Sequence, residues 1–250
     1  MQSDKKNEIL MRVTHLIDTY KNGGLGGEIM PEDENPGLAK NSAENYAYFT
    51  LPMSLNYQRN SYTLWKCAHQ SYMDADIRDV YSPLAVADMD VDVLREKLLK
   101  YKVALQPNKQ PVIWKTICKS FVELFRGDIR NLFADCDYSV MKVKRLFADN
   151  KKAFPYLGGE KILNYWLFVM QSYTDLSFSD RNLITVAPDT HVIQASVRLG
   201  LITGEQATKS DVRQIVVSQW NDLLDGTELQ SIDVHTPLWL WSRGKFVVDI

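Results

Sequence analysis

The sequence predicts an all-α protein. Apolar side chains recur three and four residues apart along nearly the whole chain, which is typical of amphipathic helices. Strand-like runs are scarce, and residues 183–186 are too few to carry a sheet. The chain has 250 residues, 45% of them hydrophobic and 24% charged. It is therefore long and apolar enough to bury a sizeable core, which excludes a disordered or fibrous class.

About ten helices are expected. The first spans residues 5–21 and ends at a glycine-rich loop, and residues 46–72 hold two helices that meet near 56–60. Residues 161–173 are apolar on nearly every face, so they are expected to form a buried central helix. The other expected helices cover 94–101 (capped by Asp90 or Asp92), 113–126, 138–147, 190–199, 210–224 and 237–242.

Charge is unevenly distributed along the chain. The net charge is −2, yet residues 100–161 hold 13 Lys and Arg against 6 Asp and Glu. This segment fits either a surface that faces phosphates or ordinary solvated helix faces. No run is long and apolar enough for a membrane span, and Cys67, Cys118 and Cys136 form no metal-binding or disulfide pattern. We therefore expect a cytoplasmic protein without metal or other cofactor.

A first candidate for chemistry is the turn at residues 154–161, which leads directly into the expected central helix. Backbone amides at such a turn, together with the helix N-terminus, can hold a phosphate. Lys161 falls in the first helical turn, where the helix dipole opposes a cation and favours a neutral, nucleophilic amine. A lysine that extends along the surface into solvent is the simpler alternative.

A second candidate is the segment at residues 187–192, which precedes an amphipathic helix that ends near Arg198. Pro188 stiffens the approach and Asp189 is a good N-cap residue. Taken alone, Asp189 is only a cap. Together with Lys161 it gives two helices that start with a possible nucleophile and a possible carboxylate.

At these two motifs the sequence resembles the helix-hairpin-helix DNA glycosylases of the endonuclease III superfamily, over roughly residues 46–202. In that family a glycine-containing hairpin and a lyase lysine precede the central helix, and an aspartate segment of the V-D-T-H type follows. Gly158 and Gly159 lie at the hairpin positions, Lys161 matches the lysine, and residues 188–201 (PDTHVIQASVRLGL) match the aspartate segment. SLNYQ at 54–58 is similar to the family's early helix end, which inserts a glutamine into DNA.

The resemblance implies a fold of two helical lobes with a cleft. One lobe would be residues 46–175, a six-helix lobe that ends in the hairpin and central helix. Both termini, 1–45 and 176–250, would form the other. The chain departs from the family pattern at Leu157, which occupies the first hairpin glycine position, and in the 28-residue spacing from Lys161 to Asp189. That longer spacing is similar to the archaeal 8-oxoguanine glycosylase branch.

The activity implied by the resemblance is that of a bifunctional DNA N-glycosylase and AP lyase. Lys161 would attack C1′ of the sugar and Asp189 would stabilise the positive charge. The other implied site residues, which would bind the substrate, are Tyr57, Gln58, Arg59, Gly158, Gly159 and His191. The partner would be double-stranded DNA with a damaged or modified base, bound by a monomer. Hydrolysis of a modified nucleotide and a non-catalytic nucleic-acid-binding module stay open as alternatives.

Overall fold

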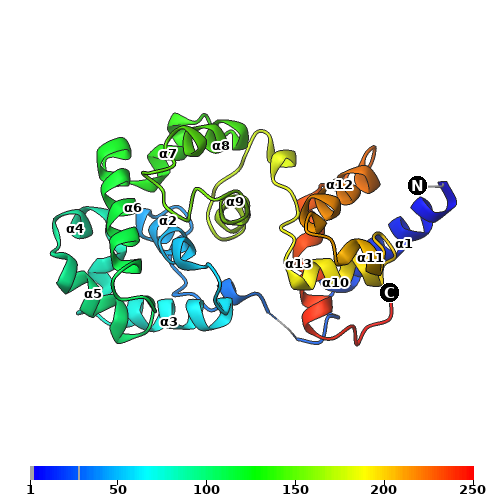
Figure 1. Ribbon diagram of the computed structural model, residues 1–250, viewed down its shortest axis with the longest axis horizontal. Coiled ribbons are helices and arrows are strands. Elements are labelled where there is room, and N and C mark those ends of the chain that lie inside the picture. The colour runs from blue at the N-terminus through cyan, green and yellow to red at the C-terminus, as the bar shows by residue number, and fades with distance from the viewer. Residues whose placement is uncertain (1–2, 28) are drawn as a thin grey trace. The chain divides into compact units, whose positions relative to one another are not determined.

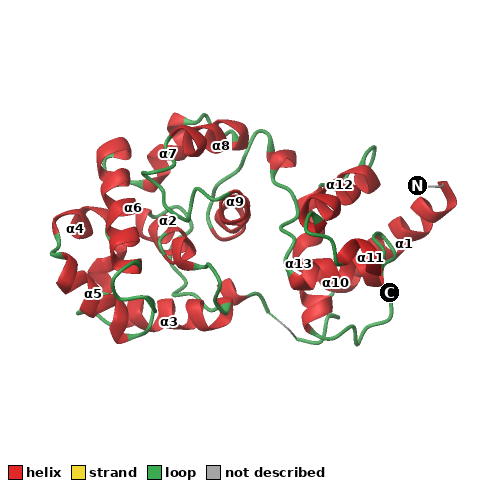
Figure 2. Ribbon diagram, in the orientation of Figure 1, coloured by secondary structure: helices red, strands yellow, loops and turns green. Residues whose placement is uncertain are grey.

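The computed structural model describes residues 3–27 and 29–250, and the regular elements in this part of the chain are all helical. Figure 2 shows helices joined by loops, with no strand among the described residues. This range contains thirteen α-helices and five 3₁₀ helices, which confirms the all-α prediction. Over the same range, no helix combines the length and the apolar character needed to cross a membrane.

Contacts divide the chain into two compact units. The central unit comprises residues 31–183, and the terminal unit comprises residues up to 30 together with 184–250. In Figure 1 the blue N-terminal helix accordingly lies with the orange and red C-terminal helices. The lobe boundaries expected at residues 46 and 175 stay a prediction.

The central unit contains most of the helices. In chain order they are η1 Pro31–Asp33, α2 Ala43–Thr50, η2 Pro52–Leu55, α3 Ser61–Met73, η3 Arg78–Tyr81, α4 Pro83–Asp88, α5 Val91–Lys100, α6 Gln110–Phe125, α7 Ile129–Asp135, α8 Val140–Asp149, α9 Glu160–Tyr173 and η4 Arg181–Leu183. Side chains cap the starts of several of these helices, and of the two caps expected for α5, Asp90 rather than Asp92 makes it.

Trp166 of α9 is at the centre of this unit's core. Its ring centroid lies 5.4 Å from that of Phe133 and 5.5 Å from that of Phe147, on α7 and α8. Its indole N–H donates to the Thr50 hydroxyl of α2 at 3.0 Å. A fully buried tryptophan contributes a large apolar area, and the hydrogen bond removes the cost of burying its one polar atom. These contacts fix α9 against α2, α7 and α8.

The terminal unit consists of the N-terminal helix and the last third of the chain. Its helices are α1 Ser3–Lys21, α10 Thr190–Arg198, α11 Gly204–Ala207, α12 Val212–Leu224, η5 Ser231–Val234 and α13 His235–Arg243. Buried Trp220 of α12 donates its indole N–H to the Ser196 hydroxyl of α10 at 2.9 Å. Arg12 of α1 donates to the backbone oxygens of Leu199 at 3.1 Å and Ile250 at 3.0 Å, which ties both chain ends to α10.

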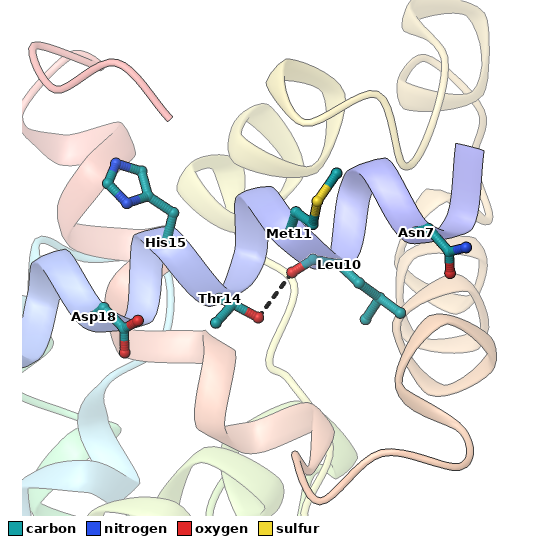
Figure 3. A pocket seen from close by; sticks show the side chains of 6 residues that line it. All are labelled: Asn7, Leu10, Met11, Thr14, His15 and Asp18. Atoms are coloured by element: carbon teal, nitrogen blue, oxygen red, sulfur yellow. Dashed lines mark hydrogen bonds between the residues drawn. The ribbon is translucent and has the colours of Figure 1, made fainter. Parts of the chain in front are cut away.

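One outer face of α1 lines a hollow made by side chains of that helix alone. Figure 3 shows its six lining residues, Asn7, Leu10, Met11, Thr14, His15 and Asp18. The Thr14 hydroxyl donates to the Leu10 carbonyl at 2.9 Å, a bond within the helix. None of the residues expected to carry chemistry lies in this hollow.

The structure corrects two expectations. Two short helices, α7 and α11, are present that the sequence did not predict, since four to seven residues are too few to show helical periodicity. The second correction concerns α9, which is buried on only part of its surface. Lys161 and Ser172 are exposed and Tyr165 and Phe168 are half-buried. These four residues follow helical spacing, so they form one accessible stripe along α9.

Candidate functional site

Lys161 is the second residue of α9 and its side chain is exposed. The turn before it is anchored by two buried side chains, Phe154 and Leu157. The Phe154 ring stacks on Phe147 of α8 with centroids 4.4 Å apart. The turn thus holds the start of α9 in a fixed place, with the lysine at its accessible end. Lys161 and Tyr165 are four residues apart, so they lie one helical turn apart on the accessible stripe of α9.

The glycines of this turn allow a tight backbone path. A Cβ on Gly158 would lie 3.0 Å from the Phe154 carbonyl oxygen, and one on Gly159 would lie 3.1 Å from that of Tyr156. Both glycine amides are used inside the turn, because Gly158 N donates to Phe154 O at 2.8 Å and Gly159 N to Tyr156 O at 3.0 Å. A phosphate at this turn would therefore depend on amides of the first turn of α9.

The turn also contacts the segment that resembles the glutamine-bearing helix end. Tyr57 is 49% exposed, and its ring stacks on Tyr156 with centroids 5.2 Å apart. Lys109 lies over the Tyr156 ring at 5.1 Å. Tyr156 and Gln58 both adopt left-handed backbone conformations, with φ of 61° and 50°. For residues other than glycine this costs about 1–2 kcal/mol each, and such strain is concentrated at functional sites.

Arg59 follows Gln58 but is committed to the fold. Its guanidinium donates to the backbone oxygens of Val103 at 2.6 Å and Lys102 at 3.1 Å. Partial burial lowers the pKa of this guanidinium. By donating to two backbone carbonyls, Arg59 fixes the loop that follows α5. Tyr57 and Gln58, next to it in the sequence, are exposed.

Asp189 is the N-cap of α10, as predicted. One carboxylate oxygen, Oδ1, accepts from the backbone amides of His191 at 2.9 Å and Val192 at 3.0 Å. The other oxygen, Oδ2, accepts from the indole N–H of Trp239 at 2.9 Å. An ionised carboxylate can accept about four hydrogen bonds, so these three donors fix its orientation without using its full capacity. The side chain is half-buried.

His191 belongs to a polar cluster behind Asp189. Its ring lies 5.0 Å from that of Trp239, edge to face, and its Nδ1 is 3.2 Å from the Ser242 hydroxyl. That hydroxyl donates to Gln194 Oε1 at 3.1 Å. His191 therefore packs against the residue that holds Asp189. Trp239 is one of four tryptophans that the sequence offered for stacking on a base, and its hydrogen bond to Asp189 was not expected, because no local sequence signal distinguishes it from the other three.

A buried acid that the sequence did not predict lies below the α9 stripe. Glu32 is fully buried, and its Oε2 accepts from the hydroxyl of Tyr165 at 3.1 Å. Burial raises the pKa of Glu32 from 4.5 to about 7, while Tyr165 and the nearby indole of Trp65 lower it. The Trp65 indole N–H acts on this carboxyl as a hydrogen-bond donor, and neither the indole nitrogen nor Oε1 has another partner among the described residues. Glu32 is thus neutral below about pH 7.

A second lysine lies on the other side of α9. Lys144 of α8 donates to Oδ1 of buried Asn164 at 3.2 Å and to the carbonyl of Leu183 at 2.7 Å. Desolvation lowers the pKa of Lys144, and the charge of nearby Glu160 acts in the opposite direction. Asn164 therefore joins α8 to α9. Lys144 is engaged with two acceptors, so we assign it a structural role.

The predicted site residues thus fall into two groups. Lys161, Gly158, Gly159, Tyr57, Gln58 and Arg59 belong to the central unit, whereas Asp189 and His191 belong to the terminal unit. Within the described residues, no group of three or more His, Cys, Asp or Glu side chains is arranged to hold a metal ion. No protein-family model matches this chain, and no curated protein matches it at a significant level.

Proposed function

We propose that the chain is a DNA N-glycosylase with AP lyase activity, with Lys161 as the nucleophile and Asp189 as the assisting carboxylate. The observation that carries this proposal is the placement of Lys161: an exposed lysine in the first turn of α9, beside half-buried aromatic side chains and after an anchored turn. A lysine amine is a nucleophile that forms a Schiff base at a sugar carbon, and the exposed position lets a bound nucleotide reach it.

The proposed reaction replaces the glycosidic bond by a bond to the enzyme. The lone pair of the Lys161 amine forms a bond to C1′ of the sugar as the bond from C1′ to the base nitrogen breaks, and the base leaves with that electron pair. Positive charge develops on the sugar during bond cleavage, and the carboxylate of Asp189 stabilises it. The nitrogen then loses a proton and the C1′–O4′ bond breaks, with its electron pair and a proton going to O4′, which gives the Schiff base. The Schiff base acidifies the C2′ proton, and loss of that proton expels the 3′ phosphate with its bonding pair and nicks the strand.

The environment of Asp189 supports its assigned role. Its two backbone amides and the Trp239 indole hold the carboxylate in one orientation, which a charge-stabilising group requires. A cap alone needs only the two amides at Oδ1. The indole at Oδ2 is an additional restraint that capping does not explain.

Access to a base inside a duplex requires that the nucleotide leave the stack. Exposed Tyr57 and Gln58 are proposed to fill the gap, supported by the stack of Tyr57 on Tyr156. Lys109 beside this stack and the exposed lysines Lys151 and Lys152 near the turn supply positive charge for the backbone.

The decisive experiment is borohydride trapping on a duplex oligonucleotide with a single abasic site. Borohydride reduces the Schiff base to a stable amine, so the wild-type chain should give a covalent protein–DNA adduct. Lys161→Ala should give none, and Lys144→Ala serves as the matched lysine control on the neighbouring helix. Absence of an adduct from the wild-type chain overturns the lyase proposal.

The same assay separates the two alternatives. Release of base from free modified nucleotides without an adduct on DNA would indicate a nucleotide N-glycosidase. Salt-sensitive DNA binding with neither adduct nor base release would indicate a non-catalytic module.

A further inference from the structure

We propose that a cavity in the central unit, remote from Lys161, binds a small zwitterion such as a free amino acid or a dipeptide. Arg78 and Arg126 would bind its carboxylate, and Glu44 would bind its ammonium group. The cavity is surrounded by α2, the end of α3, η3, α4 and the corner between α6 and α7. Its volume of about 640 Å³ lies within the range of about 300–1,000 Å³ that is typical of small-molecule sites. This inference does not depend on the proposed function.

Opposite charges line this cavity without pairing with each other. Arg78, Arg126 and Glu44 all contribute to its lining, and all three are exposed. In the described part of the chain, none of these side chains takes part in an ion pair. Arg126 also has a left-handed backbone, with φ of 57°, at the corner between α6 and α7. Charges that could neutralise one another are thus held apart around an open space.

The other two acids of the cavity are already neutralised. Asp79 is paired with Lys97 of α5 at 2.7 Å, and Asp128 is paired with Arg130 of α7 at 2.5 Å. Both of these cations lie outside the lining of the cavity. The charges left for a ligand are therefore two guanidinium groups and one carboxylate, which together complement a molecule that carries both signs.

Tyr72 fixes the two ends of the site on one buried ring. Arg78 Nε donates to the Tyr72 carbonyl at 2.8 Å, and the Arg78 guanidinium lies over the Tyr72 ring, 5.1 Å from its centroid. At the other end the Tyr72 hydroxyl donates to Glu44 Oε2 at 3.3 Å. Burial raises the pKa of Tyr72, so the hydroxyl keeps the proton that it donates. The terminal nitrogens of Arg78 and Oε1 of Glu44 have no partner among the described residues, which leaves them available to a ligand.

Small and apolar side chains provide the space between these charged groups. Ala43 and Ala47 both line the cavity and lie one helical turn apart on α2. Leu84 of α4 lines it with a side chain that is 58% exposed. Leu84 packs against Gly127, where a Cβ would lie 2.6 Å from Leu84 Cγ. A ligand with an apolar side chain would cover Leu84 and the alanines, and removal of this apolar surface from water favours binding.

The cavity lies at the end of α9 that is opposite Lys161. Asn45, the residue after Glu44, donates its side-chain amide to the carbonyl of Tyr173, the last residue of α9, at 2.9 Å. Lys161 and Tyr173 are twelve residues apart on this helix, and a rise of about 1.5 Å per residue places them about 18 Å apart. The zwitterion site is therefore distinct from the proposed site of DNA cleavage.

The unpaired charges determine the class of ligand. A guanidinium binds a carboxylate through two parallel hydrogen bonds, and a carboxylate such as that of Glu44 accepts from an ammonium group. A ligand with only negative charge would meet Glu44 without a counter-charge, and a ligand with only positive charge would meet two arginines. A free amino acid or a dipeptide carries both charges on a short body, whereas either terminus of a protein carries one of them.

Isothermal titration calorimetry of the full chain tests this inference with leucine and with leucyl-leucine. Heat of binding is expected from at least one of them, and comparison of the two gives the length of ligand that the cavity accepts. Two derivatives of the bound probe are the matched controls: the N-acetyl form lacks the ammonium group, and the amide form lacks the carboxylate. Each should bind about tenfold or more weakly, as expected for loss of a charge-assisted hydrogen bond.

Substitutions test which side chain binds each end of the zwitterion. Arg126→Gln and Arg78→Gln should each weaken its binding about tenfold or more, and Arg126 is exposed, so the fold does not depend on its charge. Glu44→Gln should weaken the zwitterion similarly but not the N-acetyl form, and the glutamine oxygen can still accept from the tyrosine hydroxyl. Arg145→Gln and Glu123→Gln are the matched controls, since both side chains are exposed and lie outside the lining of the cavity.

Three results would overturn the inference. The first is the absence of binding heat with both leucine and leucyl-leucine at up to about 10 mM. The second is equal affinity for the zwitterion and its N-acetyl form, which would mean that Glu44 takes no part. The third is an affinity that either Arg126→Gln or Glu44→Gln leaves unchanged, which would place the ligand elsewhere. Weaker binding by both variants, with the two controls equal to wild type, supports the cavity as the zwitterion site.

Discussion

Replacing Glu32 by glutamine should stabilise the protein at neutral pH and change little in acid. The shift of the Glu32 pKa from 4.5 to about 7 means that the folded state keeps a proton that the unfolded state has lost across this pH window. The folded state binds more protons there, so the free energy of unfolding falls as pH rises and levels off above about 7. At about 1.4 kcal/mol per pKa unit, the loss from this fully buried group amounts to about 3 kcal/mol.

Glu32→Gln removes this penalty because an amide has nothing to ionise. The stability gain of the variant over the wild type should be small near pH 4.5 and approach about 3 kcal/mol above pH 7. Urea unfolding of both proteins at several pH values measures it, with Glu34→Gln as the exposed control. A difference that stays constant from pH 4.5 to above pH 7 would refute a buried, neutral Glu32.

Three further predictions concern the proposed activity. Lys161→Ala should abolish the borohydride adduct and strand nicking and leave the unfolding free energy within about 0.5 kcal/mol of wild type, because the side chain is exposed. Asp189→Asn should lower base excision by orders of magnitude. The amide oxygen of the variant can still accept from the two backbone amides of the cap. Its NH₂ group, however, faces the Trp239 N–H, and the two donors should lower the free energy of unfolding by about 1–3 kcal/mol, which urea unfolding would measure. Full base excision by this variant would show that Asp189 serves only as a cap. DNA binding should weaken with salt: the logarithm of the binding constant should fall against the logarithm of the salt concentration with a slope of about −0.9 per phosphate contacted. Binding that does not change in a salt titration would contradict a basic segment that faces the phosphates of the DNA.

Local sequence signals predicted the helical elements well where they are long. α6 and α12 show periodicity over thirteen or more residues, and the caps of α5 and α10 are short side chains at the expected positions. The placement of Lys161 and Asp189 at two helix starts follows from the same rules, because a cap and its first turn are made by neighbours in the sequence. The resemblance to a glycosylase adds roles to these two residues, and those roles stay a proposal.

Exposure along α9 could not be predicted in the same way. Residues 161–173 are almost uniformly apolar, so periodicity alone does not indicate which face is left open. The burial of Trp166 against α2, α7 and α8 decides it, and leaves Tyr165 and Phe168 half-buried on the opposite stripe. A run of hydrophobic side chains therefore predicts a helix, but it does not indicate which face of that helix the other helices cover.

The sequence by itself determined the all-α class, the cap at Asp189 and the position of Lys161 in a first helical turn, since each depends on residues within a few positions of one another. Only the tertiary structure decided that the Glu32 side chain is buried and that its pKa is raised. It lies in the acidic stretch PEDENP, which has every local mark of a solvated loop, yet its hydrogen-bond partner Tyr165 is 133 residues away. Burial and pKa depend on which distant side chains surround a group, and that information is absent from the local pattern.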